Sequence, residues 1–150
     1  MTHLFVDADA CPVKDEIYRV AKRYGLQVTL VANAYMRVPT EDWIELVVVQ
    51  GRIDAADDWI VEHVTASDIV ITGDIPLASR CLQKGARVID LRGGIFTEDR
   101  ISEALVSREI LGQLRDLGTV TSGPDPFQAR DRSRFLQRLD QTIQATRKKR

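Results

Sequence analysis

The chain has 150 residues, of which 44% are hydrophobic and 29% are charged. This composition is typical of one globular domain, and a disulfide framework is excluded because the sequence holds only two cysteines. No apolar run approaches the roughly 18 residues of a membrane span, and the first residues lack a signal-peptide pattern. We therefore expect one cytoplasmic domain over residues 1–150, with no membrane partner.

The net charge of −1 is unevenly distributed along the chain. Residues 131–150 carry seven basic and two acidic side chains, whereas the remaining residues carry 14 basic and 20 acidic ones. An acidic body with a basic end favours cations in the body and a polyanion at the end. A solvated terminal helix is the alternative interpretation of the basic end.

Short apolar runs alternate with helical patterns. Strands are expected at residues 4–6, 28–32, 46–49, 69–72 and 87–89, and helices at 12–24, 54–65, 76–84, 98–115 and about 131–146. The run at 46–49 is continuously apolar, as in a strand covered on both faces. This alternation predicts an α/β fold with a mostly parallel five-stranded sheet and helices on both faces, in a Rossmann-like three-layer arrangement.

Carboxylates gather where the predicted strands end. Asp7 and Asp9 follow the first strand, Asp74 follows the fourth, and Asp57 lies in the first turn of the helix that leaves the third. Ligands of open parallel sheets bind beyond the carboxyl ends of the strands. The sequence therefore predicts a site at this edge. The structural alternative is that each aspartate caps a helix or stabilises a loop.

Asp57 has the most informative position of these residues. It falls in the middle of an apolar helical stripe with Ile60, Val61 and Val64, whereas Asp58 and Glu62 are expected to face solvent. A buried carboxylate is costly unless a cation or a hydrogen-bond network compensates its charge. Carboxylate oxygens suit Mg²⁺ or Mn²⁺, and such a site can activate water for phosphodiester cleavage.

Three motifs carry a resemblance to a known family. Residues 6–14 (VDADACPVK), 51–57 (GRIDAAD) and 71–78 (ITGDIPLA) look like those of the YaiI/YqxD family of uncharacterised bacterial proteins, and residues 131–135 (DRSRF) extend the likeness towards the end of the chain. That family is itself similar to PIN-like domains, which are metal-dependent nucleases. The resemblance thus implies a PIN-like fold and cleavage of RNA or of single-stranded nucleic acid.

The PIN-like pattern transfers to several individual residues. It implies that Asp7, Asp57 and Asp74 hold the metal, with Thr72 before Asp74 in the strand-end turn. The PIN-like pattern has a fourth acidic residue, which has no clear equivalent in this sequence. The candidates for it are Glu41, Asp42 and Asp9. We assign Asp7, Asp9, Asp57 and Asp74 as catalytic candidates, and Asn33, Thr72, Arg92 and Arg108 as binding candidates.

Two other functions fit parts of the sequence. The Asp7-Ala8-Asp9 stretch also resembles the motif of haloacid-dehalogenase-type phosphatases, in which the first aspartate is the nucleophile and the second a general acid. A non-catalytic nucleic-acid-binding protein that keeps its acidic pocket only for stability is the other alternative. Cys11, at a helix start, reads either as a reactive thiol or as a small packed residue.

Overall fold

The computed structural model describes residues 2–52, 54–116 and 126–148, with side chains described up to 107 and again from 126 to 147. Its centre is a parallel sheet of β1 (His3–Asp7), β2 (Gln27–Ala32), β3 (Ile44–Val48), β4 (Ile69–Ile71) and β5 (Arg87–Ile89). The strand order is β3-β2-β1-β4-β5, and every paired strand is parallel. The predicted α/β fold is confirmed.

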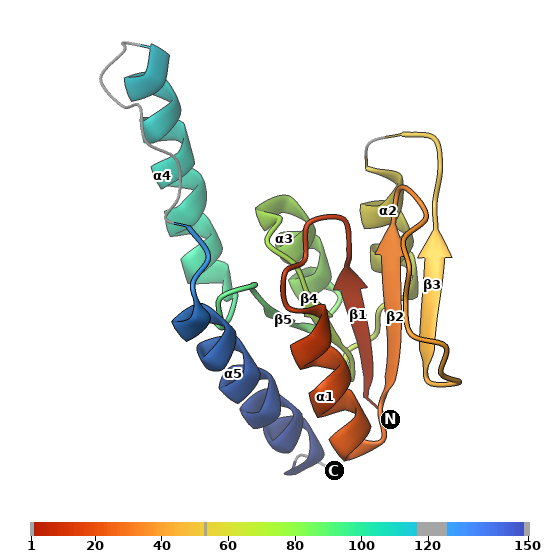
Figure 1. Cartoon of the computed structure of the whole chain (residues 1–150). Coiled ribbons are helices and arrows are strands. Elements are labelled where there is room, and N and C mark those ends of the chain that lie inside the picture. The colour runs from red at the N-terminus through yellow and green to blue at the C-terminus, as the bar shows by residue number, and fades with distance from the viewer. Residues whose placement is uncertain (1, 53, 117–125, 149–150) are drawn as a thin grey trace.

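Helices cover both faces of this sheet (Figure 1). They are α1 (Lys14–Tyr24), α2 (Ala55–His63), α3 (Ile75–Gln83), α4 (Glu98–Asp116) and α5 (Ala129–Lys148). In Figure 1, α1 and α5 lie in front of the strands, whereas α2 and α3 lie behind them. The molecule is therefore a three-layer α/β/α domain, with α4 extending beyond the carboxyl edge of the sheet.

Each face of the sheet has its own hydrophobic core, because alternate strand residues point to opposite sides. Leu4 and Val6 of β1 pack with Ile17 of α1 and with Phe135 of α5. Phe5, between them in sequence, belongs to the second core with the buried faces of α2 and α3. All three β1 residues are nearly inaccessible, which explains why this strand reads as a continuous apolar run.

Most element boundaries differ from the predictions by one or two residues, and α1 begins at Lys14 rather than at residue 12. Two of these differences have a clear physical cause. β3 begins at Ile44 rather than at residue 46, since the backbone N–H of Val28 already bonds the Trp43 carbonyl at 2.8 Å. α5 begins at Ala129, so Asp131 lies inside its first turn and accepts from the Gln128 N–H at 2.8 Å. The starts of β3 and α5 are thus set by hydrogen-bond partners that the pattern of hydrophobic residues does not show.

α5 docks on α1 through both apolar and ionic contacts. Arg132 donates to Glu16 at 3.0 Å, and Arg23 donates to Asp140 at 2.6 Å. Arg147 lies over the Tyr24 ring and donates to the Tyr24 carbonyl at 2.7 Å. Much of the basic end is therefore used within the fold, and Arg147 is not simply a solvated tail residue.

No helix in the part of the chain that the structure describes is long and apolar enough to cross a membrane.

Candidate active site

The strand order puts the topological switch point of the sheet between β1 and β4. β2 and β3 extend the sheet on one side of β1, and β4 and β5 extend it on the other, so the chain direction across the sheet reverses at β1. At such a switch point the loops leaving neighbouring strands diverge and open a binding crevice. The loops that begin with Asp7 and with Thr72 flank this crevice.

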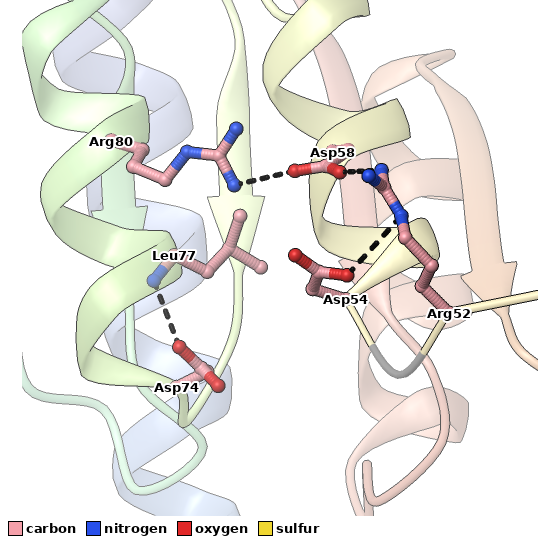
Figure 2. Close-up of polar contacts among 6 residues, drawn as sticks. All are labelled: Arg52, Asp54, Asp58, Asp74, Leu77 and Arg80. Carbon is pink, nitrogen blue, oxygen red and sulfur yellow. Dashed lines mark hydrogen bonds and ion pairs between the residues drawn. The ribbon is translucent and has the colours of Figure 1, made fainter.

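A chain of hydrogen bonds joins the two strand ends. The buried hydroxyl of Thr72 donates to Asp7 Oδ2 at 2.8 Å. The same hydroxyl oxygen accepts from the backbone N–H of Asp74 at 2.9 Å, and Asp74 Oδ1 accepts from the N–H of Leu77 at 2.8 Å. Thr72 thus orients Asp7, while Asp74 caps α3 (Figure 2). The alternative that these aspartates cap helices is therefore correct for Asp74, which uses one of its two carboxylate oxygens to cap α3.

Asp57 of α2 is the third member of this cluster of carboxylates, which we call the carboxylate group. It lies half-buried in the first turn of α2. Burial, followed by the negative charges of Asp7 and Asp74, raises the pKa of Asp57 to about 6, and the nearby Arg80 counteracts this only in part. Burial likewise raises the pKa of Asp7, with Asp74 and Asp9 adding to the effect against the Thr72 hydrogen bond. Asp7, Asp57 and Asp74 therefore repel one another across one crevice.

Asp9 and Asn33 lie together at the end of β2. The backbone N–H of Asn33 donates to both carboxylate oxygens of Asp9, at 3.0 and 3.2 Å. Asp9 is exposed, and its charge makes only a small contribution to the raised pKa of Asp7. This contact ties Asp9 to the β1–β2 side of the edge, away from Thr72 and Asp74.

Arg92 lies at the end of β5 and contacts α5. Its guanidinium pairs with Asp131 at 3.2 Å and approaches the Phe127 ring. The backbone N–H groups of Arg92 and Gly94 both donate to Asp90 Oδ1 at 2.8 Å, so a carboxylate of the chain itself occupies this amide nest. Arg108 lies in α4, and its side chain is outside the described residues.

The chemistry of the carboxylate group suits a hard divalent cation. Asp7 engages Oδ2 with Thr72 and Asp74 engages Oδ1 with Leu77, so the other oxygen of each is left for a ligand. Among the described residues, no three acidic, histidine or cysteine side chains are grouped closely enough to hold a metal ion directly. Mg²⁺ commonly binds through one or two carboxylates and retains several waters, which fits this looser arrangement.

The sequence analysis missed a pair of arginines beside this group. Asp58, expected to face solvent, is instead bonded by Arg52 and Arg80, the latter at 2.8 Å (Figure 2). Arg80 comes from α3 and lowers the pKa of the neighbouring Asp57. Asp54 occupies the N-cap position of α2 but makes no capping bond, and it pairs with Arg52 at 3.5 Å. Only the packing of α2 against α3 brings these residues together.

Neither cysteine has the environment of a reactive thiol. Cys11 is buried, and burial raises the pKa of its thiol. Cys81 is fully inaccessible, and burial raises its pKa to about 12. Between the two interpretations of Cys11, the structure thus favours the packed residue, since a nucleophilic cysteine needs a lowered pKa.

The fold and the site define a class of protein: a three-layer α/β domain with acidic side chains at the switch point of a parallel sheet. Residues 5–145 match the model of the uncharacterised bacterial YaiI/YqxD family. The chain therefore belongs to the YaiI/YqxD family, as its motifs suggest.

Relatives similar to this chain over nearly its full length are named only as UPF0178 proteins. One from Rhodospirillum centenum is 55% identical over 99% of both chains. Another, from Nitrobacter winogradskyi, is 54% identical over 97% of this chain and 92% of its own length. A third, from Paramagnetospirillum magneticum, is 51% identical over 95% of each chain. No solved structure matches the chain.

Proposed function

We propose that this protein is a Mg²⁺- or Mn²⁺-dependent nuclease of the cytoplasm that cleaves RNA or another single-stranded nucleic acid. One observation carries the proposal: three carboxylates from β1, α2 and the β4–α3 turn repel one another at the switch-point crevice. A protein tolerates such repulsion at a cost in stability, and a divalent cation removes that cost.

The chain's own residues have separate roles in this proposal. Asp7 and Asp74 each offer one uncommitted carboxylate oxygen, and Asp57 offers its carboxylate, to the ion or to its waters. Thr72 fixes the orientation of Asp7 by its hydrogen bond. When bound, the divalent cation supplies a more acidic water and neutralises charge on the scissile phosphate.

The contacts of Asp9 favour this reaction over the phosphatase alternative. A haloacid-dehalogenase-type mechanism needs Asp9 as an acid facing the substrate of Asp7. Both oxygens of Asp9 instead accept from the Asn33 N–H. We therefore assign Asp9 the role of fixing the β1–α1 loop, with Asn33 as its backbone partner.

The non-catalytic alternative rests on the basic end of the chain. Arg132 and Arg147 are engaged with α1, and Arg92 is engaged with Asp131. These guanidinium groups are partly engaged in holding α5 on the fold, so a polyanion bound to α5 alone would have to share them with those contacts. We therefore place the nucleic-acid contacts at the carboxyl edge of the sheet, beside the carboxylates.

Cleavage of an end-labelled single-stranded RNA tests the proposal. The purified protein is expected to cleave it with Mn²⁺ or Mg²⁺ and not with excess chelator. Asp57→Asn and Asp74→Asn should each lower the rate by at least about tenfold, because even outer-sphere partners of a metal contribute 10–100-fold. Asp99→Asn, an exposed change in the first turn of α4, is the matched control and should retain full activity.

Two results of this assay would contradict the proposal. One is that the protein cleaves no RNA or single-stranded DNA with either cation. The other is that cleavage persists unchanged in both Asp57→Asn and Asp74→Asn, which would indicate a contaminating nuclease.

A further inference from the structure

A pocket of about 340 Å³ is formed by the end of β3, the loop that follows it and the first turns of α2. Its lining includes Val49 and Gln50 after β3, Arg52 in the following loop, and Asp58 and Trp59 of α2. Its size is within the range of small-ligand pockets, and it combines an aromatic wall with a few polar groups. Asp58, which lines this pocket, also bonds Arg80 of α3.

The indole of Trp59 is held firmly in this pocket wall. The His63 ring stacks on it with centroids 3.7 Å apart and an interplanar angle of 14°. His63 Nδ1 also lies 2.7 Å from the Trp59 carbonyl, and the Phe5 ring lies at a 6.2 Å centroid distance on the sheet side. A preorganised aromatic surface binds a planar ligand at little cost in conformational entropy.

Two guanidinium groups bond Asp58, which lines the pocket. Asp58 bonds Arg52 on the pocket side and Arg80 on the α3 side, as Figure 2 shows. Asp58 is mostly covered, with 22% of its side chain exposed, whereas Arg52 and Arg80 are 72% and 44% exposed. The carboxylate therefore orients both guanidinium groups and leaves most of their N–H donors accessible to an oxyanion.

These features together match one unit of a nucleic-acid strand. A base stacks on aromatic side chains in a sequence-tolerant way, and such stacking contributes about 1–3 kcal/mol per base. Guanidinium groups recognise the adjoining phosphate by paired N–H donors. Gln50 and the exposed Glu62 add hydrogen-bonding groups at the pocket wall for the edge of a base.

We propose that Arg52, Arg80 and the pocket beside Trp59 form a nucleotide subsite for a single-stranded nucleic acid. The guanidinium groups contact a phosphate, and the pocket takes the base next to the phosphodiester that lies at the carboxylates. This subsite rests on the proposed function for its ligand class, but its binding step requires no cleavage. Asp58 is a positioning residue, since it acts by orienting the two arginines.

The experiment measures RNA binding by the emission of Trp59. The chain has two tryptophans, so Trp43→Phe leaves Trp59 as the reporter, and Asp57→Asn in the same chain prevents cleavage during the titration. A short single-stranded RNA should quench this emission in a saturable way. An abasic strand of the same length should bind more weakly and leave the emission unchanged, because only a base can stack on the indole.

Arginine substitutions in the same background test the phosphate contact. Arg52→Gln and Arg80→Gln should each weaken RNA binding about tenfold, as expected for loss of a charge-assisted hydrogen bond. Arg52→Lys should bind with intermediate affinity, because it keeps the charge and loses the paired donors. Arg19→Gln, an exposed change on α1 across the sheet, is the matched control and should bind like the parent.

The outcomes separate the subsite from the nuclease proposal. Unchanged emission with RNA, or unchanged affinity in both arginine-to-glutamine variants, overturns the subsite even if the wild-type protein cleaves RNA. Quenching with the expected arginine dependence supports the subsite even if the wild-type protein cleaves nothing, in which case only the catalytic proposal fails.

Discussion

The switch-point crevice and the α1–α5 interface shift the pKa values of their carboxylates in opposite directions. At the interface, Asp140 accepts from Arg23 and from Tyr24, and these bonds lower its pKa. At the crevice, burial and neighbouring carboxylates raise the pKa of Asp57 to about 6. The interface stabilises the ionised carboxylate, whereas the crevice destabilises it.

The direction of the pKa shift distinguishes charged side chains that stabilise the fold from those that are candidates for function. Ion pairs such as Arg132 with Glu16 help to position α5 and need no ligand. Asp7 and Asp57 lack a cation that offsets their repulsion fully, although Arg80 offsets part of it for Asp57. Groups with strongly perturbed pKa values in a crevice are candidates for binding and catalysis.

The largest expected effect is at the α5 side. Gly93 has a φ of +89°, and an added Cβ would lie 2.7 Å from the Arg134 carbonyl of α5. Gly93→Ala should therefore destabilise the protein by about 3 kcal/mol through backbone strain and the clash. Urea unfolding measures the loss, and Mn²⁺ affinity should be retained because α5 does not line the crevice.

Gly25→Ala is the matched control for that substitution. Gly25 has a φ of +66° but no atom within 4 Å of an added Cβ, so its change introduces strain without a clash. It should cost about 1 kcal/mol. Equal losses in the two variants would contradict the close packing of the β5–α4 loop on α5.

A smaller effect is expected from Asp57 itself. Because its pKa is raised in the folded protein, ionisation disfavours folding; the penalty starts above the ordinary aspartate pKa of 3.8 and is complete above about 6. Without metal, Asp57→Asn should be more stable than wild type by about 1 kcal/mol at pH 7, after allowance for solvent screening of this half-exposed group. The gain should shrink as the pH falls below 5.

The difference between variant and wild type is the quantity to measure by urea unfolding. Burial lowers the pKa of His3, so protonation of His3 in the unfolded chain reduces the stability of both proteins as the pH falls below about 6.5. Subtracting the free energy of unfolding of wild type from that of the variant at each pH removes this effect of His3. If Asp57→Asn is instead clearly less stable than wild type at pH 7, Asp57 is a structural hydrogen-bond acceptor.

The smallest effect is expected at Asp140. Its pKa is lowered in the folded protein by the Tyr24 hydrogen bond above all, so its contribution is present above the ordinary value of 3.8 and is lost as the pH falls through the folded pKa. Asp140→Asn should cost a few tenths of a kcal/mol at pH 7, because its partner Arg23 is more than half exposed and solvent screens the pair. Thermal unfolding at pH 7 and at pH 3 checks this, and the cost should be smaller at the lower pH.

Much of the fold was predictable because it depends on local patterns. The alternation of apolar strands with amphipathic helices identified all five strands and all five helices of the described chain. Asp57 could be recognised because its place in an apolar stripe is a property of one helix. The positions of Asp7 and Asp74 followed from the rule that parallel strands end at one edge.

The features that the sequence did not predict depend on contacts between distant segments of the chain. The position of Arg80 beside Asp58 requires α2 and α3 to pack side by side, and the pattern of a single helix does not show that arrangement. The close approach of Gly93 to α5 joins segments about forty residues apart in sequence. The bonds of Asp9 to Asn33 likewise depend on the register of β1 beside β2.

Direct measurement of Mn²⁺ binding by calorimetry at neutral pH tests the central claim most directly. Wild type should bind Mn²⁺, because a cation neutralises the repulsion among the carboxylates, and the affinity should fall as the pH is lowered through the raised pKa of Asp57. Asp57→Asn should lose most of this affinity, and Asp140→Asn should bind like wild type. Equal Mn²⁺ affinity in wild type and Asp57→Asn would contradict the account.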